Sequence, residues 1–242
     1  LGVQDVRVSR NHFGVLSGSA IMAGGVRLDA HHPTDPNLIN RNIEIADNVI
    51  AGVSQDYKDN AAILTTYIDG ARILHNDITD APYDAIAVGW GWGYNDAGGN
   101  PNYDENQKGY LYNTRFTTPT TLRNTLIEGN RIHGVKTWYM DGGAIYNLSA
   151  NPDSIIRGNH VLRIRTDGGG SGQNGNGISV FRAGGVIVEG NQIRDCALTF
   201  IRNNSGSGVQ ILGNQGRRCG EVGLFSEFAF EGAILANNHL ED

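Results

Sequence analysis

A short unit recurs along the chain: an Ile or Val, two residues of any type, and then Asn. The eight Asn residues are Asn11, Asn48, Asn76, Asn130, Asn159, Asn191, Asn214 and Asn237. In six copies another apolar residue follows the Asn by two positions, and a second apolar segment comes later in the copy. The last three Asn residues are 23 positions apart, which is too short for a strand–helix–strand unit. Each copy is therefore predicted to form one coil of short strands.

Coils of short strands with Asn and Gly at their corners are typical of a parallel β-helix, in which each strand pairs with its counterpart one coil away. The composition favours this fold, since 34 of the 242 residues are Gly and 25 are Asn. Both are poor helix formers and tolerate the left-handed backbone of tight turns. A leucine-rich repeat is the main alternative, but it requires a denser Leu pattern. We predict an all-β, single-stranded parallel β-helix (solenoid) of about eight coils, forming one domain over residues 1–242.

The charge of the chain narrows the classes of partner. The formal net charge is −6 and no basic run is present, so nucleic acid is a poor candidate. No apolar stretch approaches the roughly 20 residues that cross a bilayer, so no membrane segment is expected. The chain begins at Leu1 without an initiator Met or a signal peptide, which indicates a mature form or an excised segment. The strand edges of the terminal coils make end-to-end self-association an expected risk.

Two Cys residues occupy matching positions. Cys196 and Cys219 each lie five residues after their Asn, so they are predicted to be stacked neighbours about 4.8 Å apart at the backbone. That spacing fits a disulfide and equally a small apolar ladder. In either case both residues are interpreted as structural.

Insertions indicate where function is mounted, because loops on a rigid scaffold usually carry sites. They lengthen the first five coils, whereas the sixth and seventh coils are minimal. The inserted segments are residues 29–33, 53–58, 91–121, 135–140 and 166–176. The last is rich in Gly but lacks the Lys and the following helix of a phosphate-binding loop, so a flexible turn is expected. A binding cleft is predicted in the N-terminal two thirds of the chain.

Carboxylates are predicted at one corner of this cleft. Aligning Ile63 with Ile145 places Asp59 in register with Asp141, two coils and about 9.6 Å away. That separation overlaps the roughly 6.5 to 9.5 Å between the two carboxyl groups of inverting glycosidases. Asp84, in the coil between them, is a third candidate. An Asp at such a corner equally serves to cap a turn, so the catalytic role is a hypothesis.

Aromatic and His residues surround the same corner. Trp90 and Trp92 alternate with Gly, which leaves indole faces uncrowded for stacking on sugar rings, although either one could instead fill the core under a long loop. The further candidates for substrate binding are Tyr57, Trp138, Tyr139, His31 and His32. The His pair lies in an insertion expected to fold over the same face. No zinc spacing and no calcium loop is present, and neither a metal nor a cofactor is predicted.

The sequence resembles known β-helix proteins in two parts. Residues 20–148, with Asp29-Ala30-His31-His32-Pro33, Gly89-Trp90-Gly91-Trp92-Gly93 and Asp141-Gly142-Gly143-Ala144-Ile145-Tyr146, resemble secreted right-handed parallel β-helix proteins such as family 141 of the glycoside hydrolases. The resemblance implies a right-handed helix, an Asp pair at the cleft and plant polysaccharides containing fucose or xylose. Residues 163–242, with Gly172-Gln173-Asn174-Gly175-Asn176-Gly177, resemble twin-arginine-translocated repeat proteins of uncharacterised function. Together they imply an extracellular or periplasmic protein and a possible family seam near residues 160–165, as in natural divergence or a fusion.

Three functions follow as hypotheses. The first is a glycoside hydrolase on plant or microbial polysaccharides or oligosaccharides, in which Asp141 and Asp59 divide the acid and base roles. The second is a polysaccharide lyase, in which Lys58, Lys136 or Arg182 abstracts a proton beside a uronate. The third is a non-catalytic solenoid scaffold, engineered or truncated.

Overall fold

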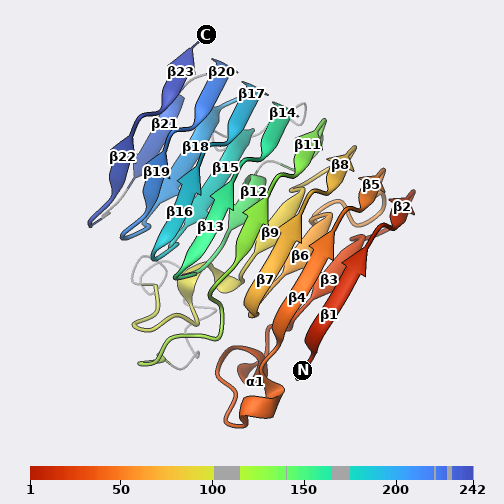
Figure 1. Ribbon diagram of the computed structural model, residues 1–242, viewed down its shortest axis with the longest axis vertical. Helices are drawn as coiled ribbons and strands as arrows, with labels where there is room; N and C mark the ends of the chain where they lie inside the picture. Colours follow the sequence, from red (N-terminus) through yellow and green to blue (C-terminus); the bar gives the residue numbers. More distant parts are fainter. Residues whose placement is uncertain (101–114, 140, 165–174, 221, 228–230, 242) are drawn as a thin grey trace.

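The computed structural model describes residues 1–242 except 101–114, 140, 165–174, 221, 228–230 and 242. Its strands form three parallel sheets that wind around one axis as a right-handed parallel β-helix, which confirms the predicted fold (Figure 1). The N- and C-termini lie at opposite ends of the stack. No helix in the described part of the chain is long and apolar enough to cross a membrane.

Each of the first seven coils contributes one strand to each sheet, and the last coil contributes a strand to sheets A and B. Sheet A stacks β1 (Gln4–Ser9), β4 (Arg41–Ala46), β7 (Asp69–Leu74), β10 (Leu126–Glu128), β13 (Ser154–Arg157), β16 (Val186–Glu189), β19 (Gln210–Leu212) and β22 (Ile234–Ala236). Sheet B stacks β2 (His12–Gly14), β5 (Val49–Ala51), β8 (Asp77–Thr79), β11 (Arg131–His133), β14 (His160–Ile164), β17 (Gln192–Cys196), β20 (Gln215–Cys219) and β23 (His239–Glu241). Sheet C stacks β3 (Ile21–Ala23), β6 (Ile63–Thr65), β9 (Ile86–Val88), β12 (Gly143–Asn147), β15 (Asn176–Phe181), β18 (Thr199–Asn204) and β21 (Val222–Glu227).

The core is built from rows of β-branched side chains that point inward from each sheet. In sheet C the row runs through Ile63, Ile86, Ile145, Ile178 and Ile201, all with no exposed surface. Sheets A and B carry equivalent rows of Ile and Val. Burying one such side chain contributes about 1.5–3 kcal/mol, so the stacked rows supply most of the stabilisation of the coils.

The corner between sheets A and B has the same construction in every coil. Exactly two residues separate the strands: the first has a positive φ and the second is Asn. Each buried Asn side chain donates to the Asn of the next coil and to a backbone carbonyl of the preceding coil; Asn130, for example, donates to Asn159 at 3.0 Å and to the Ile73 oxygen at 2.9 Å. The buried Asn side chains therefore form a continuous hydrogen-bonded stack.

The sequence prediction is wrong by one residue at the last copy. In the last coil Ile211 pairs with Leu235, not with Ile234, and Asn214 donates to Asn238 at 2.9 Å. Asn237 instead takes the left-handed position of the corner, with a φ of 58°. Asn tolerates that conformation almost as Gly does, so two adjacent Asn residues made the register ambiguous.

The other two corners carry the insertions. The segment between β3 and β4 contains α1 (Leu28–His31) and the 3₁₀ turn η1 (Pro36–Leu38), and the segment between β9 and β10 contains η2 (Gly91–Gly93). Sheet B continues across the proposed family seam, since β14 pairs with both β11 and β17. Cys196 and Cys219 lie opposite each other in β17 and β20.

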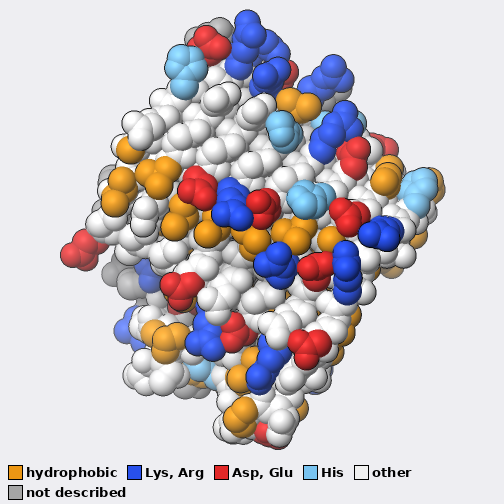
Figure 2. Space-filling model, viewed as in Figure 1, with side chains coloured by type: hydrophobic (Ala, Val, Ile, Leu, Met, Phe, Trp, Pro, Cys, Tyr) orange, Lys and Arg blue, Asp and Glu red, His pale blue; other side chains and the backbone are white. Residues whose placement is uncertain are grey.

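The outer faces of sheets A and B carry charges of both signs. On the face in view, Lys and Arg alternate with Asp and Glu rather than forming a patch of one sign (Figure 2). Arg7 and Arg72 flank Glu44 on neighbouring strands, at 2.9 and 3.6 Å. At the two ends of the stack Val6 and Leu235 are exposed, and end-to-end association stays a prediction.

Candidate functional site

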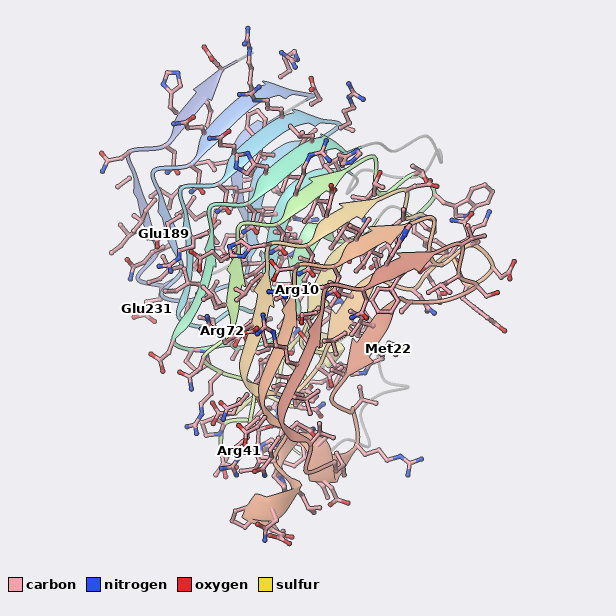
Figure 3. The ribbon with its side chains drawn as sticks, turned by 45° about the vertical axis from the view of Figure 1, so that its right-hand side comes forward. Arg10, Met22, Arg41, Arg72, Glu189 and Glu231 are labelled. Carbon is pink, nitrogen blue, oxygen red and sulfur yellow. The ribbon has the colours of Figure 1, made fainter. Side chains whose placement is uncertain are left out.

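A pocket of about 290 Å³ lies over the outer face of sheet C. Its floor follows one outward-facing row of the sheet, in which Met22, Leu64, Ala87 and Tyr146 lie in register on four successive coils. Met22 belongs to the first of these coils (Figure 3). Because inward residues alternate with outward ones, the same strands that fill the core place this row on the outer side of the sheet, beneath the pocket.

The predicted register of the Asp corner is found in the structure. Ile63 and Ile145 both pair with Ile86, so Asp59 and Asp141 hold the same offset on coils either side of Asp84. Asp59 is exposed and lines the pocket. Asp141 is also exposed but does not line the pocket, and its Oδ1 accepts a hydrogen bond from the Gly142 amide at 2.9 Å. The structure thus brings Asp59 and Asp84, and not Asp141, to the pocket wall.

Asp84 forms a buried ion pair beneath the pocket. Its side chain and that of Lys136 are both fully buried, and the Lys136 Nζ lies 2.9 Å from Asp84 Oδ1. The same ammonium group donates to the backbone oxygen of Asp141 and lies 4.6 Å from the centre of the Tyr83 ring. Asp84 Oδ2 has no hydrogen-bond partner. One oxygen of this carboxyl group therefore accepts a hydrogen bond from a cation, whereas the other accepts none.

Burial raises the pKa of Asp84, the nearby Asp141 adds to the effect, and the resulting pKa is about 7. Lys136 and the Gly143 amide act in the opposite direction but do not offset the loss of water. Burial also raises the pKa of the Tyr83 hydroxyl, and Asp84, Asp141 and Asp59 add to the effect. Tyr83 therefore lies within the field of all three carboxyl groups and keeps its proton.

Trp90 and Trp92 form the aromatic wall of the pocket, beside Tyr146 of its floor. Trp92 has a φ of 51°, a strained conformation for a bulky residue, between two Gly residues with φ of 78° and 83°. Its Nε1 donates to the Tyr146 hydroxyl at 3.2 Å. Trp90 is held by its backbone oxygen, which accepts from the Tyr67 hydroxyl at 2.7 Å and from Ser149 Oγ at 2.8 Å.

Three predicted aromatic residues lie outside the pocket lining. Tyr57 and Trp138 are exposed, and Lys58 Nζ lies 4.0 Å from the centre of the Trp138 ring. Tyr139 is exposed and makes an edge contact with Tyr83, the centres of the two rings being 5.9 Å apart. Their indole and phenol faces border the corner of the site without contributing to the pocket surface.

The predicted His pair is placed behind the aromatic wall. His31 is buried against Tyr67, and His32 stacks on Phe116 with ring centres 4.0 Å apart. His32 Nε2 lies 2.8 Å from the Thr118 oxygen, which only accepts, so this nitrogen carries the proton. His31 Nδ1 then donates to His32 Nδ1 at 2.7 Å. The pair ties α1 to residues 116–118 and does not line the pocket.

Sequence reasoning missed the pairing of Lys136 with Asp84 and the pocket surface of Tyr83 and Tyr146. Lys is rarely fully buried, so nothing in the pattern marked Lys136 as a core residue. Tyr146 could have been found, since it follows Ile145 and so points outward from β12. Within the described residues no three His, Cys, Asp or Glu side chains are arranged to hold a metal. The Gly-rich turn lies largely outside the described residues.

Comparisons with known proteins point to the fold. No family model matches the chain, and no curated protein matches it. A solved structure described as "Glycoside hydrolase" is similar over 98% of this chain, with a TM-score of 0.62 and 18% identity. A second, "The complex structure of XylC with xylose", is similar over 83% of the chain, with a TM-score of 0.56 and 20% identity.

The chain spans a third of the length of each of these two proteins. A third structure is the surface protein and adhesin PfbA of Streptococcus pneumoniae. The match spans 99% of this chain and 65% of that protein, with a TM-score of 0.47 and 13% identity. For the first two structures, at 18% and 20% identity, the likeness shows the fold alone.

Proposed function

We propose that this chain binds a carbohydrate in the pocket over sheet C and hydrolyses a glycosidic bond there. The observation that carries the proposal is the pairing of two unlike carboxyl groups in one aromatic-walled pocket: Asp59 is exposed, whereas Asp84 is buried and has a raised pKa. Two carboxyl groups whose environments separate their pKa values are the requirement for acid and base catalysis of glycoside hydrolysis.

Asp84 is assigned the role of general acid. With a pKa of about 7 its carboxyl group is largely protonated in mildly acidic solution, and Oδ2 is available to donate because Lys136 occupies Oδ1. Asp84 is fully buried in this structure, so the floor of the pocket has to open slightly as the sugar binds. Catalytic hydrogen bonds commonly form only in the substrate complex.

Asp59 is assigned the role of general base that activates water. Asp59 and Asp84 lie on adjacent coils and are offset by two residues, which places their Cα atoms about 8 Å apart if the corner keeps strand spacing. Side chains at this Cα spacing can reach the carboxyl separation of roughly 6.5–9.5 Å that inverting hydrolysis requires. Trp90 and Trp92 supply apolar faces on which a sugar ring stacks.

The cations proposed for a lyase are engaged elsewhere. Lys136 is paired with Asp84, Lys58 lies over Trp138, and Arg182 donates to the Gly99 oxygen at 2.7 Å. None of them lines the pocket. Hydrolysis therefore has more support than elimination. The solved structures named above, one of them described with xylose, are in keeping with a neutral sugar as ligand. Action outside the cell or in the periplasm is part of the proposal and follows from the sequence resemblance.

The test is a screen of xylan, fucosylated and uronate-containing polysaccharides for release of reducing ends, with ultraviolet absorbance followed in parallel to detect elimination. Asp59→Asn is expected to lower kcat about 100- to 10,000-fold without unfolding the chain, because Asp59 is exposed. Asp56→Asn, an exposed change in the same insertion, is the matched control. If Asp59→Asn retains full activity, the assignment of the base is wrong.

A second variant separates the two candidate pairs of carboxyl groups. Asp141→Asn is expected to retain activity in acidic solution, because Asp141 does not line the pocket, but to lose it at a lower pH than the parent because the charge that raises the pKa of Asp84 is removed. Loss of activity in this variant with normal activity in Asp59→Asn would favour Asp141. Silence of the parent protein across the whole panel would favour a non-catalytic scaffold.

A further inference from the structure

The turn that carries Lys136 is bonded to the turn that carries Asp84. The Lys136 amide donates to the Ala81 oxygen at 2.9 Å and to the Tyr83 oxygen at 3.2 Å, and both residues shortly precede Asp84 in the chain. Lys136 has a φ of 62°, a left-handed conformation that is uncommon for a residue with a side chain. From this anchored backbone the side chain reaches Asp84 with none of its surface exposed.

A buried ion pair of this kind adds little net stability when it joins two turns, because burying its charges costs free energy. Removing two charges from water costs several kcal/mol for each ion, and apolar side chains of similar volume often stabilise a fold as well or better. The backbone bonds already join the two turns. The ammonium group therefore has to be explained by what it does to the carboxyl group it contacts.

We propose that Lys136 is a positioning residue that binds Asp84 Oδ1 and the backbone oxygen of Asp141, so that Asp84 presents Oδ2 to the substrate. Gly142 completes the arrangement: a Cβ atom there would lie 2.8 Å from Asp84 Oδ2 and 2.6 Å from the Tyr146 ring. The same Cβ atom would lie 2.9 Å from Asp84 Oδ1, so the lack of a side chain at Gly142 leaves room for both oxygens of the carboxyl group, one of which Lys136 holds.

The same contact sets the proton affinity of Asp84. The groups that act on it are Lys136, the carboxylate of Asp141 and the Gly143 amide, with Tyr83 beside it and Asp59 in the adjacent coil. Lys136 favours the charged form, while burial and Asp141 favour the neutral form. Without Lys136 the carboxyl group would bind its proton more tightly and would release it to a leaving group less readily. This role rests on the proposed function.

The experiment compares Lys136→Met with the parent protein by two readouts. Carboxyl ¹³C NMR of Asp-labelled protein follows the titration of Asp84, with its resonance identified by its loss in Asp84→Asn. The midpoint is expected to rise by at least about one pH unit in Lys136→Met. The alkaline limb of the pH profile of kcat/KM should rise by the same amount, with kcat lowered at least tenfold. Lys58→Met, which removes a half-buried cation that does not contact Asp84, is the control for the titration.

The outcomes separate the two proposals. A titration midpoint that is unchanged in folded Lys136→Met overturns the role of Lys136. A midpoint that rises in a protein that hydrolyses no glycan supports the coupling and removes the proposed function. If Lys136→Met does not fold, the ¹⁵N resonance of the Lys136 ammonium group in the parent protein decides: it should shift with the same midpoint as Asp84, and independence of the two overturns the proposal.

Discussion

The stack of buried Asn side chains leads to a quantitative prediction at Asn130. Its Oδ1 accepts from the backbone amide and the side chain of Asn76, at 2.9 and 3.0 Å, and its Nδ2 donates to Ile73 and Asn159. Asn130→Ala removes these four bonds and leaves the buried Asn76 amide without an acceptor. The orphaned amide costs about 1–3 kcal/mol and each of the other three lost bonds about 1 kcal/mol, so the unfolding free energy should fall by about 4–6 kcal/mol.

The matched control is Asn11→Ala at the exposed end of the same stack. Asn11 donates to Asn48 and Ser9, and water can replace both bonds, so the expected cost is below about 1 kcal/mol. Urea unfolding followed by far-ultraviolet circular dichroism measures both variants. In a chain of this length the difference corresponds to a fall in Tm of several degrees. Equal costs at the two positions would show that the stack does not stabilise the coils, and the reasoning would be wrong.

Three further predictions concern the site and its supports. The free energy of unfolding should decline as the pH falls from 6.5 towards 4, because folding lowers the pKa of His31 to about 4 and the unfolded chain binds the proton in this range. His31→Asn should flatten this dependence, which urea midpoints at pH 5 and pH 7 measure. Trp92→Ala should weaken glycan binding about tenfold in titration calorimetry, whereas Trp138→Ala, outside the pocket, should change it little. Gly142→Ala should lower the free energy of unfolding by about 1–3 kcal/mol and abolish activity, because its Cβ would meet Asp84 and Tyr146. Gly158→Ala, whose Cβ would have no atom within 4 Å, should lower it by about 1 kcal/mol and remain active. Equal effects of the two changes would contradict the proposed crowding.

The repeat carried enough information to predict the fold. Inward Ile and Val residues and a corner Asn recur because every coil has to fill the core and to close the turn between sheets A and B. The register of Ile63 with Ile145 followed directly. Where two Asn residues were adjacent, at Asn237 and Asn238, the pattern was ambiguous and only the pairing of β19 with β22 resolved it.

The site was predicted less completely, because its contacts join insertions rather than repeats. Lys136 reaches Asp84 across 52 positions and from a different turn, and no spacing rule connects them. His31 and His32 were expected over the cleft, but the His31 ring packs against Tyr67 and the His32 ring stacks on Phe116. Hydrophobic contacts between long loops depend on their full shape, which a residue pattern does not encode.

The two-residue corner between sheets A and B has a consequence for how such a protein can change. Because all eight of these corners are equal in length, every coil returns to the same line whatever the length of its other two turns. An insertion at those turns therefore alters neither the rise of the solenoid nor the pairing of its neighbours. The walls of the pocket can be exchanged, one coil at a time, while the floor keeps its alignment.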